Sequence, residues 1–141
     1  MRLLPAVAAV LALSACATPH VQPPLTPPPD FAGSSVEERA LVMADGARLP
    51  LMRWAPQGEP WAVIVALHGM NDHAASFRLA GPWWAEQGIE TWAYDQRGFG
   101  AAPGRGEWAG QARMVEDLRE AVALARARHP RAMIAVVGES M

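Results

Sequence analysis

Short apolar runs recur along the chain at Trp61 to Leu67, Ile89 to Tyr94 and Ala132 to Val137. Each has the length of a β-strand rather than of a helix. The first run, Trp-Ala-Val-Ile-Val-Ala-Leu, has no polar alternation, which is typical of a strand covered on both faces in a parallel sheet. We therefore predict three strands here, the first of them fully buried.

Helical periodicity occupies the segments between these runs. Gln111 to Arg128 predicts an amphipathic helix that ends at His129-Pro130. A second helix is predicted over about Ser76 to Gln87, with Gly81-Pro82 as a break or restart. The apolar stripe of the long helix comprises Met114, Leu118, Ala121, Val122 and Ala125, and we expect the acidic residues Glu116, Asp117 and Glu120 to be solvated.

A β-hairpin is predicted ahead of these elements. Glu38 to Met43 and Arg48 to Trp54 flank an Asp45-Gly46 turn. Pro50 suggests an edge strand or a short break, because proline cannot donate a ladder hydrogen bond. Strands that then alternate with helices indicate an α/β fold with right-handed crossovers.

The N-terminal stretch has the pattern of an export signal. Met1-Arg2 carries a charge, and Leu3 to Leu13 is an apolar run too short to span a bilayer. Leu13-Ser14-Ala15-Cys16 resembles the lipobox of bacterial lipoproteins, which implies removal of residues 1–15 and acylation of Cys16. By analogy, Ala17 favours the outer membrane of a Gram-negative cell, facing the periplasm. The alternative is a plain secretory signal with a chance cysteine.

Thr18 to Pro29 contains six prolines in twelve residues, which predicts an extended tether over residues 16–36 that holds the fold off the membrane. A proline-rich recognition motif is the alternative. We expect the folded domain to occupy residues 37–141.

Composition narrows the function only slightly. The formal net charge of −2 gives no argument for a nucleic-acid partner, and all twelve basic residues are arginine. A single cysteine excludes an internal disulfide and a cysteine-built metal site.

Three motifs follow the predicted strands in order. His68-Gly69-Met70-Asn71 follows the first strand, Asp95 to Gly100 the second, and Gly138-Glu139-Ser140-Met141 the third. The last is most of a G-x-S-x-G nucleophile elbow, which presents a serine hydroxyl at the end of a sheet. The alternative for Ser140 is an ordinary helix cap.

Together these motifs resemble the α/β-hydrolase family, and within it the lysophospholipase and monoacylglycerol-lipase-like group. The resemblance implies that Ser140 is the nucleophile and that the backbone N–H groups of Met70 and Met141 form the oxyanion hole. His68, Gly69 and Gly138 would shape the oxyanion loop and the elbow, as would the Asp95 turn beneath them. No metal or organic cofactor is implied. The substrate would be an ester of the acyl glycerol or lysophospholipid class.

The resemblance covers about residues 37 to 141, roughly the first half of the family's domain. In that family the catalytic acid and histidine follow the serine, whereas His20, His68, His73 and His129 all precede Ser140. We therefore expect a polypeptide ending at residue 141 to be inactive and not independently stable. The alternatives are a non-catalytic lipid- or partner-binding envelope lipoprotein, a peptidase or a general carboxylesterase.

Overall fold

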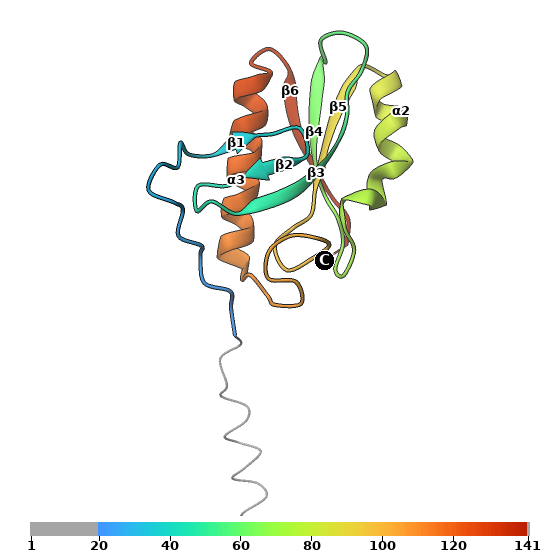
Figure 1. The fold of residues 1–141 in the computed structure, drawn as a ribbon. Helices are drawn as coiled ribbons and strands as arrows, with labels where there is room; N and C mark the ends of the chain where they lie inside the picture. Colours follow the sequence, from blue (N-terminus) through green and yellow to red (C-terminus); the bar gives the residue numbers. More distant parts are fainter. Residues whose placement is uncertain (1–19, 141) are drawn as a thin grey trace, which may run out of the picture.

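The computed structural model describes residues 20–140, so the signal segment, Cys16 and Met141 lie outside the described residues. Within that range one sheet has the strand order β1-β2-β3-β5-β4-β6 (Figure 1). Its strands are β1 (Ser35–Val36), β2 (Ala40–Val42), β3 (Arg48–Trp54), β4 (Ala62–Leu67), β5 (Ile89–Tyr94) and β6 (Met133–Gly138). The helical elements are η1 (Ala74–Arg78), α2 (Ala80–Glu86) and α3 (Gln111–Arg128).

The predicted hairpin is confirmed. β2 and β3 are antiparallel, with Leu41 opposite Leu49, and Gly46 adopts the left-handed conformation at the turn with φ of 80°. The edge-strand interpretation of Pro50 is wrong, because β3 lies between two neighbours. Pro50 faces Ala40 of β2, and pairing with β5 begins at the next residue, Leu51. The proline therefore lies where β3 passes from one partner strand to the other.

The α/β architecture is also confirmed. β4 pairs in parallel with β5 on one side and with β6 on the other. Two crossovers of the same hand that run in opposite directions along a sheet place their helices on opposite faces. Figure 1 shows this arrangement, with α2 on one face and α3 on the other. β4 is buried along most of its length, as its apolar sequence predicts.

Each face of the sheet has its own apolar core. On one face, α3 contributes Ala121 and Ala125 to a core built around Trp92 and Tyr94. On the other face, Phe77 of η1 packs with Ile64 and Ala66 of β4. The predicted helix over Ser76 to Gln87 divides into η1 and α2, and Pro82 lies in the first turn of α2, where it is tolerated.

One expectation for α3 is wrong. Asp117 is buried rather than solvated, and its side chain is only 2% exposed. Glu120 is partly buried, because its carboxylate accepts hydrogen bonds from Ser34 Oγ and the backbone N–H of Ala44. Glu120 therefore holds the hairpin and the segment before it, whereas Glu116 is exposed as expected.

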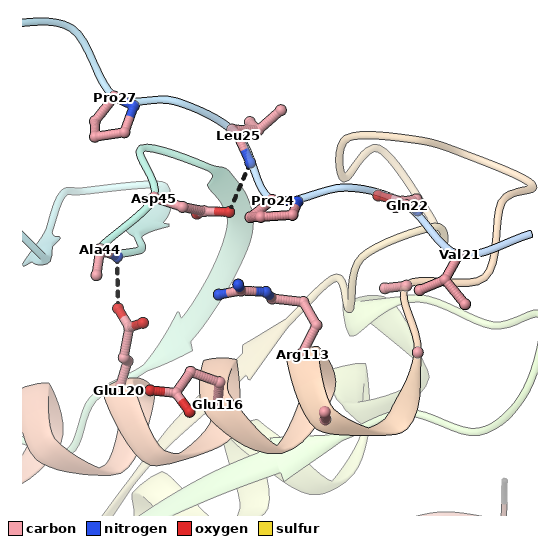
Figure 2. A pocket seen from close by; sticks show the side chains of 13 residues that line it. Val21, Gln22, Pro24, Leu25, Pro27, Ala44, Asp45, Arg113, Glu116 and Glu120 are labelled. Carbon is pink, nitrogen blue, oxygen red and sulfur yellow. Dashed lines mark hydrogen bonds between the residues drawn. The ribbon is translucent and has the colours of Figure 1, made fainter.

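The segment of residues 21–27, which we call the strap, is extended as its prolines predict but lies against the domain. Gln22 donates from its backbone N–H to the Trp108 carbonyl. The backbone N–H of Leu25 donates to Asp45 Oδ2 (Figure 2). Pro27 packs on Gly46 at the hairpin turn. A hollow of about 660 Å³ lies between the strap, the hairpin turn and the first half of α3. Residues 21–27 therefore pack on the folded domain instead of extending away from it.

Candidate active site

The strand order of the sheet indicates where a binding site should lie. From β4 the chain crosses to β5 on one side and then to β6 on the other. Ligands of open α/β sheets bind beyond the carboxyl ends of the strands at such a switch point. The residues directly after β4 and β6 are His68-Gly69-Met70 and Glu139-Ser140. The topology thus brings together the two motifs that the sequence separates.

Ser140 is exposed at this end of the sheet. The backbone N–H of Glu139 donates to the Leu67 carbonyl at 2.9 Å, which continues the pairing of β6 with β4. The Ser140 carbonyl then accepts a hydrogen bond from the Met70 N–H at 3.0 Å. Ser140 is therefore held beside the loop after β4, with its side chain at the surface.

Gly69 is required by this contact. A Cβ atom at Gly69 would lie 2.5 Å from the Ser140 carbonyl oxygen, closer than real Cβ contacts come. At Gly138, the small residue expected at the elbow, a Cβ would meet no described atom within 4 Å. The close packing in the described residues is thus at Gly69.

The loop after β4 is strained at one residue. Asn71 has φ of 62°, in the left-handed region that residues other than glycine seldom adopt, although asparagine tolerates it better than most. Such strain concentrates in functional loops. The preceding Met70 is 51% exposed, and its N–H is engaged by Ser140. Met141, the other expected donor, lies outside the described residues.

His68 is fully buried and holds two loops together. Its Nε2 accepts the backbone N–H of Gln96 at 3.0 Å, and its Nδ1 lies 2.8 Å from the Gly69 carbonyl. A single tautomer, with the proton on Nδ1, satisfies both hydrogen bonds. Gln96 also donates from Nε2 to the His68 carbonyl at 2.7 Å. These bonds fix the end of β4 against the turn after β5.

Asp95 anchors the surrounding backbone. Its buried carboxylate accepts the N–H of Ala74 through Oδ1 at 2.7 Å and that of Ala101 through Oδ2 at 2.8 Å. It thereby joins η1, which follows the Met70 loop, to the loop between β5 and α3. The sequence indicates that this turn shapes the site, but not which backbone groups it binds.

Arg97 does not pair with Asp95. Its guanidinium binds Asp45 with two hydrogen bonds of 2.7 and 2.8 Å and Asp117 with two of 2.7 and 2.9 Å. Burial tends to raise the pKa of Asp45, but hydrogen bonds from Arg97 and from the N–H groups of Ala47 and Leu25 lower it to about 2. Burial raises the pKa of Asp117 despite the same guanidinium. This ion cluster locks the hairpin, the post-β5 turn and α3 together beneath the site.

Two hollows adjoin the site. One of about 180 Å³ is lined by residues of the Met70 loop and of the loop between β5 and α3, including Met70, Phe99 and Trp108. The other, of about 430 Å³, is mainly apolar and lies between Leu67 and the side chains of Met114, Val115 and Leu118 on α3. Both open near the carboxyl ends of β4 and β5.

No histidine among residues 20–140 is hydrogen-bonded to the Ser140 hydroxyl. His73 Nδ1 lies 3.1 Å from Asp72, its neighbour in sequence. His129 Nε2 lies 3.2 Å from Glu90, at the opposite end of the sheet, where β5 and β6 begin. Among the described residues, Ser140 is therefore exposed at the end of the sheet, and no histidine is positioned there as its general base.

Residues 20–140 lack two kinds of feature. No group of three or more His, Cys, Asp or Glu side chains is arranged to hold a metal ion. In the same range, no helix has both the length and the apolarity needed to cross a membrane.

Comparisons with known proteins agree with this geometry. Residues 58–141 match the family model described as serine aminopeptidase, S33 (Hydrolase_4). A monoacylglycerol lipase of Mycolicibacterium smegmatis is 30% identical over 109 residues, which make up 77% of this chain and 39% of the lipase. An uncharacterized abhydrolase domain-containing protein of Dictyostelium discoideum is 32% identical over 80 residues, or 56% of this chain and 8% of that protein.

Solved structures show the same fold. A soluble variant of monoglyceride lipase from Saccharomyces cerevisiae, in complex with a substrate analog, aligns with a TM-score of 0.63 at 24% identity. The alignment covers 82% of this chain and 40% of that one. A lipase in its open form aligns with a TM-score of 0.59 at 21% identity, over 74% of this chain and 36% of that one. The chain thus spans less than half the length of these relatives.

Proposed function

Because this chain belongs to the serine aminopeptidase S33 family of the α/β-hydrolases, we propose that Ser140 is the nucleophile of a serine hydrolase acting on carboxylic esters. One observation carries this proposal. Ser140 is exposed directly after β6, and its backbone is bonded to the loop after β4 at the switch point of the sheet. A serine used only as a helix cap would not need this second loop.

The chemistry follows from this placement. The Ser140 hydroxyl oxygen attacks the ester carbonyl carbon while a general base takes its proton. The tetrahedral intermediate carries a negative oxygen, which backbone N–H groups stabilise. Collapse of the intermediate breaks the bond to the alcohol, which leaves with the proton, and water then hydrolyses the acyl-serine. The N–H groups of Met70 and Met141 are our candidates for the donors.

We assign the general base to residues outside the described range. His68 is buried with both ring nitrogens engaged, His73 lies beside Asp72, and His129 lies at the far end of the sheet. None of the three is hydrogen-bonded to the Ser140 hydroxyl. A polypeptide limited to residues 17–141 is therefore expected to be inactive, whereas the whole protein is expected to be active.

The proposed substrates are esters of the acyl glycerol or lysophospholipid class. The similarity to a monoacylglycerol lipase supports this class, as does the mainly apolar hollow between Leu67 and α3. A peptidase or a general carboxylesterase remains the alternative within the same chemistry. Turnover of acyl glycerols, short-chain esters and aminoacyl amides by one preparation separates the three.

The deciding experiment is hydrolysis of p-nitrophenyl esters by the whole protein and its Ser140→Ala variant. Loss of turnover in Ser140→Ala, with an unchanged far-ultraviolet circular dichroism spectrum, is the expected result. Unchanged turnover would refute the assignment of the nucleophile. Turnover by residues 17–141 alone that Ser140→Ala abolishes would instead refute the location that we assign to the base.

A second function is favoured by one specific observation. The Met70 N–H already donates to the Ser140 carbonyl, so this oxyanion donor is occupied in the structure. A non-catalytic envelope lipoprotein that binds a lipid or a partner on the same scaffold would need no free donor. Labelling of the whole protein with a fluorophosphonate distinguishes the two, because only a hydrolase is modified at Ser140.

We also propose that the protein is exported and anchored to a membrane, facing the periplasm from the outer membrane, by acyl chains on Cys16. The support is the lipobox-like sequence Leu13-Ser14-Ala15-Cys16 that follows the apolar run. Several acyl chains hold a protein stably, whereas one does so only marginally. Retention of the protein in the membrane fraction, and its release to the soluble fraction in Cys16→Ala, is the expected result.

A further inference from the structure

The strap is attached to the same end of the domain as the candidate active site. The Gln22 side chain donates to the carbonyls of Gly104 and Glu107 at 3.1 and 2.7 Å, and its N–H donates to Trp108. A Cβ atom on Gly104 would lie 2.3 Å from the end of the Gln22 side chain, and Gly104 has φ of 69°, a conformation that favours glycine. The strap is thus fitted to the loop between β5 and α3.

That loop belongs to the margin of the site. We call residues 70–71 and the loop of residues 98–108 the rim, since residues 70–71, 98–99 and 106–108 line the hollow of about 180 Å³ next to Met70. In Figure 1 the strap, in blue, reaches the domain at the end where this loop and the C-terminus lie. The beginnings of β4, β5 and β6 lie at the opposite end of the sheet.

Because the strap binds the rim through Gln22, the distance between Cys16 and the rim is limited by the few residues that connect Cys16 to Gln22. Five residues lie between Cys16 and Gln22, so six residue-to-residue steps connect them. A fully extended chain spans at most about 3.5 Å per residue, so Gln22 lies within roughly 20 Å of Cys16 in any conformation of the intervening residues. A strand such as β4 is itself about 20 Å long, so the far end of the sheet lies about that much farther from Gln22 than the rim does, and it could face the membrane only with the connection almost fully extended.

We propose that the strap turns the rim, and with it the candidate active site, toward the lipid surface in which Cys16 is anchored. This inference rests on the proposed anchoring. Exposed apolar side chains occur on the rim and strap but also at the far end, at Trp61 and Met133, so the short connection and not apolarity carries the orientation. Met70 is 51% exposed, Val21 44% and Leu25 46%. A lipid substrate would then enter the site directly from the bilayer surface.

The orientation can be measured by energy transfer to the membrane. Acylation removes the thiol of Cys16, the one cysteine among residues 1–141, and any cysteine elsewhere in the whole protein is replaced by serine, so an introduced cysteine is the single labelling site. Arg105→Cys places a fluorophore on the rim, and Glu86→Cys or Gln57→Cys places it at the opposite end of the sheet. The lipidated protein is reconstituted in phosphatidylethanolamine and phosphatidylglycerol vesicles that carry an acceptor on the lipid headgroup.

We expect energy transfer from Arg105→Cys to be several-fold more efficient than from Glu86→Cys and Gln57→Cys. Equal transfer from the two ends, or greater transfer from the far end, would overturn the proposed orientation. Failure of the protein to bind the vesicles would instead refute the anchoring at Cys16.

A matched variant tests the role of the strap. A flexible glycine- and serine-rich insertion between residues 19 and 20 lengthens the connection but leaves the strap contacts intact. It should keep vesicle binding while the difference in transfer between the two ends disappears. Persistence of the difference would show that a feature other than the short connection orients the domain, which contradicts the proposal.

Discussion

The Ser140 carbonyl oxygen lies 2.5 Å from the position that a Cβ atom on Gly69 would occupy. The two residues are far apart in sequence, and the parallel pairing of β4 with β6 brings them together. Gly69 is thus the point at which the loop after β4 and the serine turn touch through backbone atoms. The expected elbow glycine, Gly138, has open space around it in the described residues.

We predict that Gly69→Ala lowers the free energy of unfolding by about 1–3 kcal/mol, because the added methyl group overpacks the contact with Ser140. The matched variant Gly138→Ala should change it by no more than about 0.5 kcal/mol, as is usual for a substitution with open space around it. Urea unfolding of the purified protein followed by circular dichroism measures both. Equal losses in the two variants would contradict the structural assignment.

The hydrogen bonds between His68 and Gln96 support a second prediction. Gln96→Ala leaves the buried His68 carbonyl without its side-chain donor, which should cost about 1–3 kcal/mol of unfolding free energy. Gln57→Ala, an exposed glutamine, is the control and should have little effect. A neutral result for Gln96→Ala would show that the loop after β4 does not depend on the turn after β5.

The sequence predicts the order of the elements well because apolar periodicity records burial along each strand. β4 and α3 begin and end close to their predicted residues. The pattern fails where a polar residue is buried with a partner distant in sequence. Asp117 lies on α3 among residues whose pattern predicts solvation, and only the fold shows that it shares the Arg97 guanidinium with Asp45.

The sequence predicts the candidate site in part, as it does the fold. The motifs point to Ser140, Gly69 and His68 as candidates, because each of these residues directly follows a predicted strand in a recognisable motif. They do not identify Gln96 as the partner of His68, because that pairing depends on β4 and β5 lying side by side. The strap is missed for a different reason. Proline-rich sequence predicts an extended chain but not the surface against which it lies.

The third prediction concerns the stability that the buried Arg97 contributes. Arg97→Met removes the counter-charge of two buried carboxylates and should lower the free energy of unfolding by about 3–5 kcal/mol. Arg48→Met is the matched control, because Arg48 pairs with Glu37 on the exposed surface and such pairs contribute little. Urea unfolding of both variants measures the difference. Similar small losses in the two would show that the buried cluster adds no more than a surface pair.

The two aspartates around Arg97 give a fourth prediction, in the dependence of stability on pH. The pKa of Asp45 falls from 3.8 to about 2 in the folded protein. Its contribution to stability is therefore present above pH 3.8 and is lost as the pH falls toward 2. Asp45→Asn should lower stability at neutral pH and remove this part of the acid-induced loss.

Asp117→Asn tests a contribution to stability whose dependence on pH is opposite to that of Asp45. Burial raises the pKa of Asp117 in the folded protein, so its protonation favours folding. That contribution is present below pH 3.8 and is lost as the pH rises through the higher folded pKa. Without it, the loss of stability on acidification should be steeper in Asp117→Asn than in the unsubstituted protein, whereas in Asp45→Asn it should be shallower. Urea unfolding at a series of pH values between 2 and 6 measures the slopes, and slopes that change in the same direction in both variants would contradict the assignment.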